Sequence, residues 1–242
     1  MSKQRIDILL VEKDFFPSRE QAKKAIMAGI VWGDKKRITK AGDMVNDDVS
    51  IEITEKSKYV GRGGEKLEKA LETFKVKVKG KICLDIGAST GGFSDCLLQY
   101  GAKKVYAVDV GYGQIAWSLR NNPLVEVREK INARYLKKED FIKRPQLATI
   151  DVSFISLDKI IPPLVSVLTK PGEIIALIKP QFEAGRDDVG KGGIVRDPEV
   201  HTKCIEKIKV LGHNLKLTVE GVIDSPILGA KGNKEFLIYL IH

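Results

Sequence analysis

The sequence has little cysteine and little histidine, with three residues of each among 242. Cys83, Cys96 and Cys204 form an odd set, and none is spaced from another as C-x-x-C. The histidines also lack the paired spacing of metal ligands. The sequence therefore predicts neither a disulfide framework nor a zinc site, and we expect no metal.

Long apolar runs are missing as well. No stretch approaches the roughly 18 uninterrupted apolar residues that a membrane-spanning helix needs. The beginning of the chain, Met1 to Asp7, lacks the apolar core of a signal peptide. We therefore expect a soluble, cytoplasmic protein without a membrane partner.

Length and charge narrow the class of protein further. A chain of 242 residues can form one sizeable core and a small additional domain. Its formal net charge is +9, and a basic surface of this kind favours a polyanionic partner such as nucleic acid.

Residues 1–56 have the pattern of a small α+β domain. The apolar residues from Ile6 to Val11 predict a short helix, and Ser18 is a suitable N-cap for a second helix over 19–27. Short strands are expected at 30–32 and 49–53.

We expect several basic residues of this domain to lie close together in space. Arg19, Lys23 and Lys24 occupy neighbouring turns of the second helix, and we expect Arg5 nearby. The pattern resembles the S4 RNA-binding domain, and the resemblance implies that these four residues contact RNA. A solvated basic face is the alternative.

A polar stretch separates this domain from the rest, and we expect a linker at 57–60 and a second domain over 61–242. The glycine-rich run from Val60 to Leu67 leads into a helix that ends near Phe74. Arg62 and Lys66 lie at the entrance of this helix, where they could face a ligand. Two exposed helix residues are the alternative.

The second domain alternates between strands and helices. A parallel sheet with helices on both faces, of the α/β class, follows from this alternation, with ligands at the carboxyl ends of the strands. Expected strands span 81–86, 104–109, 124–128, 146–151, 173–178, 216–223 and 235–241, with a helix after Pro198.

The first of these strands leads into a glycine-rich turn, Gly87 to Gly92, and then a helix. The turn lacks the G-x-G-x-x-G of dinucleotide-binding proteins, because Ser89 replaces the second glycine, and it lacks the G-K-[ST] of a phosphate-binding loop. The next strand ends in Asp109, whose carboxylate can accept hydrogen bonds from both ribose hydroxyls. A ribose without a pyrophosphate cradle indicates S-adenosylmethionine, and an ordinary tight turn is the alternative.

Ionisable residues occur where buried strands end or begin. Asp151 and Lys179 follow two strands that should flank the first one, and Glu235 opens the last strand. A lysine at the end of so apolar a strand is unusual, because lysine avoids burial unless it is paired. With Lys66 from the preceding helix, these residues can gather beside the cofactor.

Two lysines and two carboxylates suit methyl transfer to a ribose 2′-hydroxyl, which must lose its proton to become a good nucleophile. We predict that Lys179 is the base and Lys66 its electrostatic partner. Asp151 would position Lys179, and Glu235 would orient the group.

The motifs together resemble one family: the TlyA, or hemolysin A-like, ribosomal RNA methyltransferases, in which an S4 domain precedes an FtsJ-like Rossmann methyltransferase domain. The matching segments are 60–67, 84–93, 151–154, 179–186 and 189–197. The resemblance implies 2′-O-methylation of cytidine in ribosomal RNA, with Lys66, Asp151, Lys179 and Glu235 as the catalytic residues. Arg62 joins the RNA-binding residues. The implied cofactor contacts are Asp85, Gly87, Ala88, Ser89, Thr90, Gly91, Gly92, Phe93, Asp109, Val110, Asn132 and Asp151.

Other functions stay open at this point. The run from Asp151 to Phe154 resembles the [DN]-P-P-[FY] motif of amino methyltransferases, which would direct the methyl group to a base nitrogen. An RNA-binding assembly factor without turnover is a second possibility, and a membrane-lytic protein is a third. The glycine-rich segment 181–198 suits either a lid over the substrate or a long connector. The nucleotide, the ribosomal subunit and the oligomeric state are not specified by the sequence.

Overall fold

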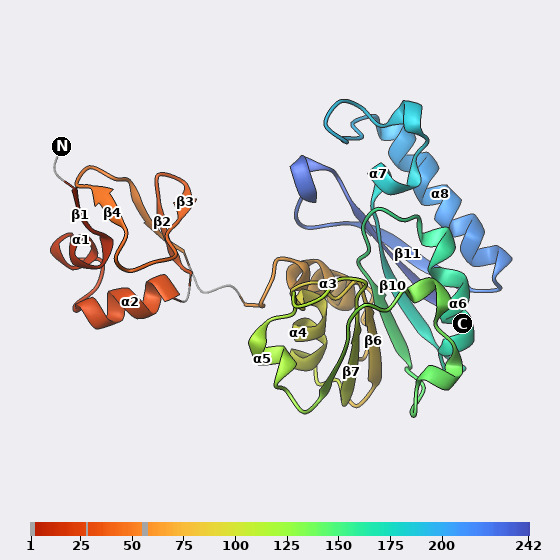
Figure 1. Ribbon diagram of the computed structural model, residues 1–242. Coiled ribbons are helices and arrows are strands. Elements are labelled where there is room, and N and C mark those ends of the chain that lie inside the picture. The colour runs from red at the N-terminus through yellow and green to blue at the C-terminus, as the bar shows by residue number, and fades with distance from the viewer. Residues whose placement is uncertain (1–2, 28, 55–57) are drawn as a thin grey trace. The chain divides into compact units, whose positions relative to one another are not determined.

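The computed structural model describes residues 3–27, 29–54 and 58–242, and it divides the chain into two compact units. The N-terminal unit spans 1–58 and the C-terminal unit 59–242 (Figure 1). Of the expected linker, residue 57 lies outside the described residues, while Tyr59 is only 3% exposed and packs in the core of the C-terminal unit.

The N-terminal unit packs two helices, α1 (Ile6–Glu12) and α2 (Arg19–Met27), against short strands. Ser18 accepts a hydrogen bond from the backbone of Gln21, as expected of an N-cap. Apolar side chains of both helices share one core. The strands are β1 (Lys3–Arg5), β2 (Val31–Gly33), β3 (Lys36–Arg37), β4 (Met44–Asn46) and β5 (Ile51–Ile53).

Three of these strands were not predicted. β1 pairs with β4, and β3 lies beside β2, which also pairs with β5. Each of the unpredicted strands has only two or three residues. Strands this short show no readable alternation of apolar and polar residues. The pairing of β1 with β4 also joins segments that are far apart in the sequence.

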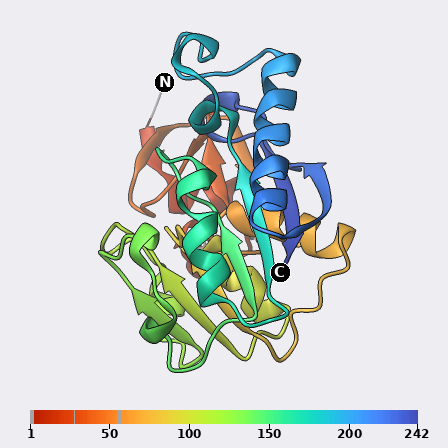
Figure 2. The same cartoon turned by 90° about the vertical axis from the view of Figure 1, so that its right-hand side faces the viewer.

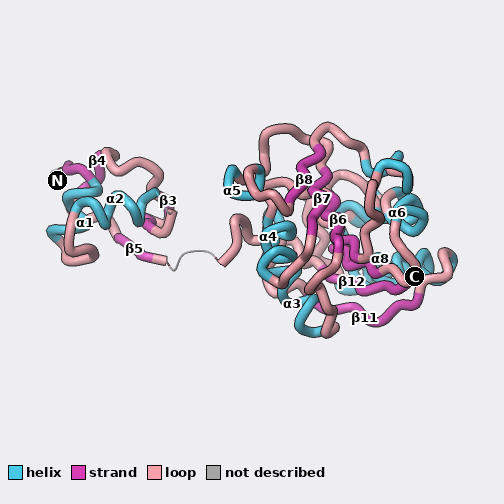
Figure 3. The backbone as a smooth tube through the Cα atoms, turned by 90° about the horizontal axis from the view of Figure 1, so that it is seen from below, coloured by secondary structure: helices cyan, strands magenta, loops and turns pink. Residues whose placement is uncertain are grey.

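The C-terminal unit contains a seven-stranded sheet in the order β11-β12-β10-β9-β6-β7-β8 (Figure 3). β12 runs antiparallel to both of its neighbours, and the pairs from β10 to β8 are parallel. This topology confirms the α/β prediction. Two details of the prediction were wrong: the sheet is mixed and not wholly parallel, and β10 lies beside β9 and not beside β6. The strands are β6 (Ile82–Ile86), β7 (Lys104–Val108), β8 (Val125–Arg128), β9 (Leu147–Ile150), β10 (Glu173–Ile178), β11 (Thr218–Asp224) and β12 (Phe236–Ile241).

Helices cover both faces of this sheet (Figures 1 and 2). Successive residues of β6 point to opposite faces: Cys83 packs with helices α3 and α4, whereas Leu84 packs with α6 and α8. The central strands are therefore buried on both sides, as their continuous apolar sequence predicts. The helices are α3 (Gly63–Thr73), α4 (Gly92–Gln99), α5 (Trp117–Arg120), α6 (Ile161–Val167), α7 (Pro180–Glu183) and α8 (Pro198–Asn214).

One predicted helix is absent from the described residues. Between β8 and β9 the chain forms only two 3₁₀ turns, at Ala133–Tyr135 and Lys138–Asp140. Asn132 caps the first turn by accepting a hydrogen bond from the backbone of Arg134. The local hydrogen bond competes with a longer helix, so the prediction of a helix between every pair of strands was wrong here.

Candidate active site

Four of the predicted site residues directly follow parallel strands. Gly87, Asp109, Asp151 and Lys179 come immediately after β6, β7, β9 and β10. Parallel strands end at the same edge of a sheet, so these residues lie along one edge. Glu235 immediately precedes antiparallel β12 and therefore lies at this edge too.

The turn after β6 depends on two glycines with positive φ. Gly87 has a φ of +81°, and a Cβ at this position would lie 2.3 Å from the backbone oxygen of Asp151. Gly91 has a φ of +97°, and a Cβ there would lie 2.2 Å from a methyl group of Leu119. A larger residue at either position would displace the wall of the site.

A cavity of about 420 Å³ opens beside this turn. Asp109 lies in its wall, and each of its carboxylate oxygens accepts one backbone hydrogen bond, from Ser89 at 2.8 Å and from Gly111 at 2.7 Å. Each oxygen keeps a further lone pair for a ligand. The predicted residues that line this cavity are Gly87, Ser89, Asp109, Val110, Asn132 and Asp151.

A second cavity of about 210 Å³ shares part of this lining. Gly63, the first residue of α3, belongs to its wall, and so does Lys179. Gly87, Ser89, Asp151 and Ser153 line both cavities, so the two are neighbours. The remaining predicted residues in this wall are Ala88, Thr90, Gly92 and Phe93.

Lys179 and Asp151 form an ion pair within the smaller cavity. The distance from Lys179 Nζ to Asp151 Oδ1 is 2.6 Å, and the ammonium also donates to the hydroxyl of Ser153 at 3.0 Å. The lysine side chain is 11% exposed and the aspartate side chain 22%. An ammonium so placed can contact a substrate that enters the cavity.

Lys66 and Glu235 form a second ion pair, which is more deeply buried. Lys66 Nζ lies 2.6 Å from Glu235 Oε2, although the residues are 169 positions apart. Their side chains are 10% and 2% exposed. Ile178 of β10 pairs with Phe236 of β12. The strands are antiparallel, so one residue beyond this pair Lys179 lies opposite Glu235. Neither member of the Lys66–Glu235 pair is part of either cavity wall.

Two predicted cofactor residues are also absent from the walls. Gly91 shapes the turn without reaching the cavities, and Asp85 is fully buried within β6. The hydroxyls of Ser94 and Thr149 donate to the Asp85 carboxyl at 2.7 and 3.2 Å. Burial raises the pKa of Asp85 to about 7, while these hydrogen bonds act in the opposite direction.

The predicted RNA-binding residues occupy both units. Arg5 and Arg19 donate to the same buried carboxylate, that of Asp7, at 3.0 and 2.8 Å. Lys23 and Lys24 are exposed on α2. Arg62, in the C-terminal unit, is exposed immediately before α3.

Several residues near the site were not found from the sequence. Glu183 of α7 is buried and accepts hydrogen bonds from the backbone of Leu157 and from Lys207. Asn233 accepts from the backbone of Val195 and donates to that of Gly193, which ties segment 181–198 to the turn before Glu235. No local sequence pattern identifies these contacts, because each joins segments that are far apart in the chain.

Residues 3–27, 29–54 and 58–242 contain neither a cluster of metal ligands nor a membrane-spanning helix. No three His, Cys, Asp or Glu side chains there gather as a metal-binding group. No helix in those ranges is both long and apolar enough to cross a membrane. The three cysteines are buried free thiols.

Family models match both parts of the chain. Residues 59–241 match the FtsJ-like methyltransferase family, and residues 4–51 match the S4 domain. The chain is 51% identical over 240 residues to YqxC of Bacillus subtilis, covering 98% of this chain and 85% of YqxC. It is 42% identical over 238 residues to the 16S/23S rRNA (cytidine-2′-O)-methyltransferase TlyA of Mycobacterium tuberculosis, covering 98% and 89%.

The fold has a similar counterpart among solved structures. A protein from Streptococcus thermophilus, described as a hemolysin, superposes with a TM-score of 0.77 at 46% identity, covering all of this chain and 89% of the other. The predicted resemblance is thereby confirmed over nearly the whole length. This chain belongs to the FtsJ-like methyltransferases, in the TlyA and hemolysin A-like group whose members carry an N-terminal S4 domain.

Proposed function

We propose that this protein transfers a methyl group from S-adenosylmethionine to the 2′-hydroxyl of a cytidine in ribosomal RNA. The observation that carries the proposal is the Lys179–Asp151 ion pair, which lines one cavity together with the glycine turn. The name of the TlyA relative supports both the ribose position and the cytidine. A ribosomal substrate also agrees with a cytoplasmic protein.

The cavity walls fit S-adenosylmethionine. A volume of about 420 Å³ lies in the usual range for small-molecule sites. The free lone pairs of Asp109 can accept the two ribose hydroxyls, and Asn132 in the same wall is a candidate for the adenine edge. When bound, the cofactor supplies a methyl group that is electrophilic because it is attached to a sulfonium.

Lys179 is the proposed general base. Its Nζ lies in the smaller cavity. Lys179 would first release its ammonium proton to solvent, and the neutral amine would then take the proton of the 2′-hydroxyl while the oxygen bonds to the methyl carbon and the methyl–sulfur bond breaks. Asp151 holds the side chain through an ion pair at 2.6 Å, and the hydroxyl of Ser153 accepts a hydrogen bond from it. These two partners fix the direction in which the amine points, and a general base depends strongly on such fixed geometry.

Lys66 and Glu235 support the base from the same edge of the sheet. Their ion pair is nearly enclosed, so each charge is balanced without water. A Cβ at Gly229 would lie 1.9 Å from Glu235 Oε1, so the backbone of this glycine closes over the carboxylate. We assign this pair an electrostatic role toward Lys179 and no direct contact with the cofactor.

Binding of the RNA itself is assigned to basic residues of both units. Arg5, Arg19, Lys23 and Lys24 of the N-terminal unit would contact phosphates, as would Arg62 of the C-terminal unit. The S4 match over residues 4–51 supports this assignment.

Methylation of a base nitrogen is less well supported by the contacts. In that reaction the carboxylate at position 151 would accept a hydrogen bond from the amino group of the base. Here the Asp151 carboxylate already pairs with Lys179. A lysine has no evident task in nitrogen methylation, whereas it has a clear one at a hydroxyl.

The base assignment is tested with Lys179→Ala and Lys179→Arg. Arginine keeps the positive charge and can pair with Asp151, but it cannot accept a proton. We expect both variants to bind S-adenosylmethionine like the wild type and to lose methyl transfer by about 100-fold or more. Substantial activity in Lys179→Arg would show that position 179 contributes charge and not proton transfer.

The position of the methyl group is read from the RNA product. A 2′-O-methyl group blocks alkaline cleavage at the modified nucleotide, since the neighbouring hydroxyl is no longer available to attack the phosphate. We expect one gap in the alkaline ladder of ribosomal RNA treated with the wild-type protein, at a cytidine. Incorporation of methyl groups without such a gap would contradict the proposal.

A further inference from the structure

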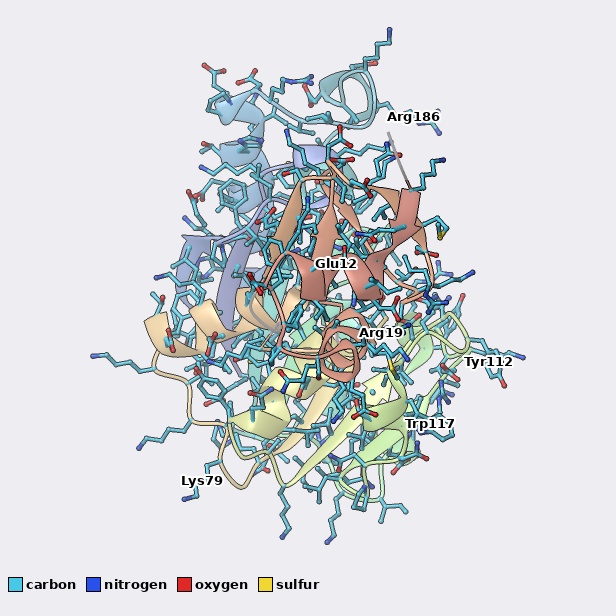
Figure 4. The ribbon with its side chains drawn as sticks, turned by 90° about the vertical axis from the view of Figure 1, so that its left-hand side faces the viewer. Glu12, Arg19, Lys79, Tyr112, Trp117 and Arg186 are labelled. Carbon is cyan, nitrogen blue, oxygen red and sulfur yellow. The ribbon has the colours of Figure 1, made fainter. Side chains whose placement is uncertain are left out.

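Three aromatic side chains of the C-terminal unit lie almost fully in solvent. Tyr112, Trp117 and Tyr135 are 71%, 77% and 69% exposed. None of them belongs to the wall of either described cavity. Figure 4 shows Tyr112 and Trp117 reaching outward from the same part of this unit. Aromatic rings kept out of the core in one region indicate a surface for a partner.

Hydrogen bonds join the segments that carry these rings. The backbone of Lys130 donates to that of Gly111 at 3.1 Å, and the backbone of Gly113 donates to the carboxylate of Glu129 at 2.7 Å. Arg120 of α5 pairs with the same carboxylate at 2.6 Å. Tyr112 and the helix that begins at Trp117 are thus fastened to the segment that leads to Tyr135.

The same segments form a wall of the larger cavity. Val110 and Gln114 line it from one segment, and Ile131 and Arg134 from the other. The residue before Trp117, Ala116, donates its backbone N–H to Thr90 in the glycine turn. The exposed rings therefore lie on the outer rim of the cofactor cavity.

Two cations accompany the rings. Lys130 Nζ lies 4.8 Å from the ring centre of Tyr112, and the guanidinium carbon of Arg134 lies 5.3 Å from that of Tyr135. Rings for stacking together with cations for phosphates are the combination with which proteins bind single-stranded nucleic acid. We name Tyr112, Trp117, Lys130, Arg134 and Tyr135 the aromatic rim.

We propose that the aromatic rim binds unpaired nucleotides that flank the methylated one, with bases stacked on its rings and phosphates beside Lys130 and Arg134. This inference rests on the proposed function, because it takes the substrate to be RNA. The smaller cavity, which would take the target ribose, adjoins the larger cavity, whose wall carries the rim, so nucleotides next to the target can reach the rings. Only nucleotides released from a helix expose base faces to such rings. The rim therefore selects RNA whose strand is locally open at the target.

The fluorescence of Trp117 gives a direct test. The chain has two tryptophans, so Trp32→Phe leaves Trp117 alone. We expect single-stranded RNA containing the target to quench this fluorescence, and a fully paired duplex of the same sequence to quench it much less. The anisotropy of labelled RNA shows when the protein is saturated. If the fluorescence of Trp117 is unchanged at saturation, the inference is overturned. Quenching caused by protein concentration alone would also overturn it, since a second copy of the chain would then cover the rings.

A kinetic experiment separates this inference from the proposed function. We expect the triple variant Tyr112→Ala, Trp117→Ala, Tyr135→Ala to raise the KM for RNA by about 10-fold or more, as lost stacking implies. Its affinity for S-adenosylmethionine should not change, because the rings lie outside the cavity walls. The matched control is Ile142→Ala, which removes another apolar side chain that is 93% exposed. An active wild type with an unaltered KM in the triple variant would refute the rim alone, whereas an inactive wild type would refute the proposed function.

Discussion

Asp7 is a fully buried acid that holds two half-exposed arginines in the N-terminal unit. Arg5 and Arg19 bond to its carboxylate, and their side chains remain 45% and 50% exposed. The hydrogen bond from Arg5 is the largest cause that lowers the pKa of Asp7 from 3.8 to about 2, with Arg19 acting in the same direction against the effect of burial. Since the folded pKa is the lower one, this stabilisation is complete above about pH 4 and is lost as the pH falls toward 2.

Replacing Asp7 tests whether it prearranges these arginines for RNA. Asp7→Asn removes a negative charge, so a simple field argument predicts tighter binding of RNA. We expect instead that binding weakens by roughly 5- to 150-fold, because immobilising each of the two freed arginines costs about 0.5–1.5 kcal/mol. Filter binding at neutral pH and fixed salt measures the change.

The matched control removes the same charge from an exposed position of α2. Glu20→Gln leaves both arginine contacts intact, and it should bind RNA as tightly as the wild type or more tightly. If Asp7→Asn also binds more tightly, the buried acid has no organising role.

Asp85 has the opposite dependence on pH. Its folded pKa, about 7, lies above the ordinary 3.8, so the folded state keeps a proton that the unfolded state loses. Stability should therefore fall as the pH rises from about 4 to 7 and then level off. The Asp85→Asn variant lacks this loss. We expect its free energy of unfolding, relative to that of the wild type, to rise on the order of 2–4 kcal/mol between pH 5 and pH 8, measured with urea. Parallel pH profiles for the two proteins would refute the raised pKa.

At the scale of elements, Glu183 joins three segments around the base. Its carboxylate accepts from the backbone of Leu157 at 2.7 Å, from the hydroxyl of Ser156 at 2.5 Å and from Lys207 at 2.9 Å. These bonds connect α7, which follows Lys179, with the loop that follows Asp151 and with α8. The positions of the two cavity residues thus depend on a carboxylate outside the cavity.

The Lys207–Glu183 pair can be tested by stability. Lys207→Met leaves the Glu183 carboxylate, whose side chain is 2% exposed, without its cation. We expect the free energy of unfolding to fall by about 1–3 kcal/mol. Adding Glu183→Gln to this variant should restore part of the loss. Lys209→Met is the control: it breaks a pair with Glu206 in which both side chains are at least one third exposed, and it should change stability by less than about 0.5 kcal/mol. Equal effects of the two lysine variants would refute the role of the buried carboxylate.

The elements also show how far the sequence alone could reach. The strand before Gly87, its turn and the following helix were predicted correctly, because apolar residues and glycines are close together there. β1 and β4 were missed, since three residues form a strand only through a distant partner. The contact of Lys66 with Glu235 spans 169 residues, so spacing could not predict this ion pair, although the positions of both residues at the ends of elements predicted that they gather at one edge.

At the scale of the whole molecule, the excess of basic residues is shared by the two units. The formal charge of +9 would attract RNA to any part of the surface. The contribution of a specific RNA-binding face to affinity must therefore be distinguished from the attraction that the overall charge exerts on RNA. The dependence of affinity on salt provides this distinction, because only cations that displace counterions from phosphates contribute to its slope.

Two triple variants with equal charge changes make the comparison. Arg19→Gln, Lys23→Gln, Lys24→Gln neutralises the proposed RNA-binding face of α2. Lys75→Gln, Lys77→Gln, Lys79→Gln neutralises exposed lysines between α3 and β6, at the end of the sheet opposite the cavities; Lys79 is marked in Figure 4.

We expect the first variant to reduce the slope of log K against log salt by about 2, at roughly 0.7–0.9 for each lost phosphate contact. The second should leave the slope unchanged and lower the affinity only slightly, because its lysines meet no phosphate. Measurement from low to moderate salt with the same RNA gives both slopes. If the two variants lose equal slope, RNA is held by overall charge, and the assignment of binding to α2 fails even if methyl transfer persists.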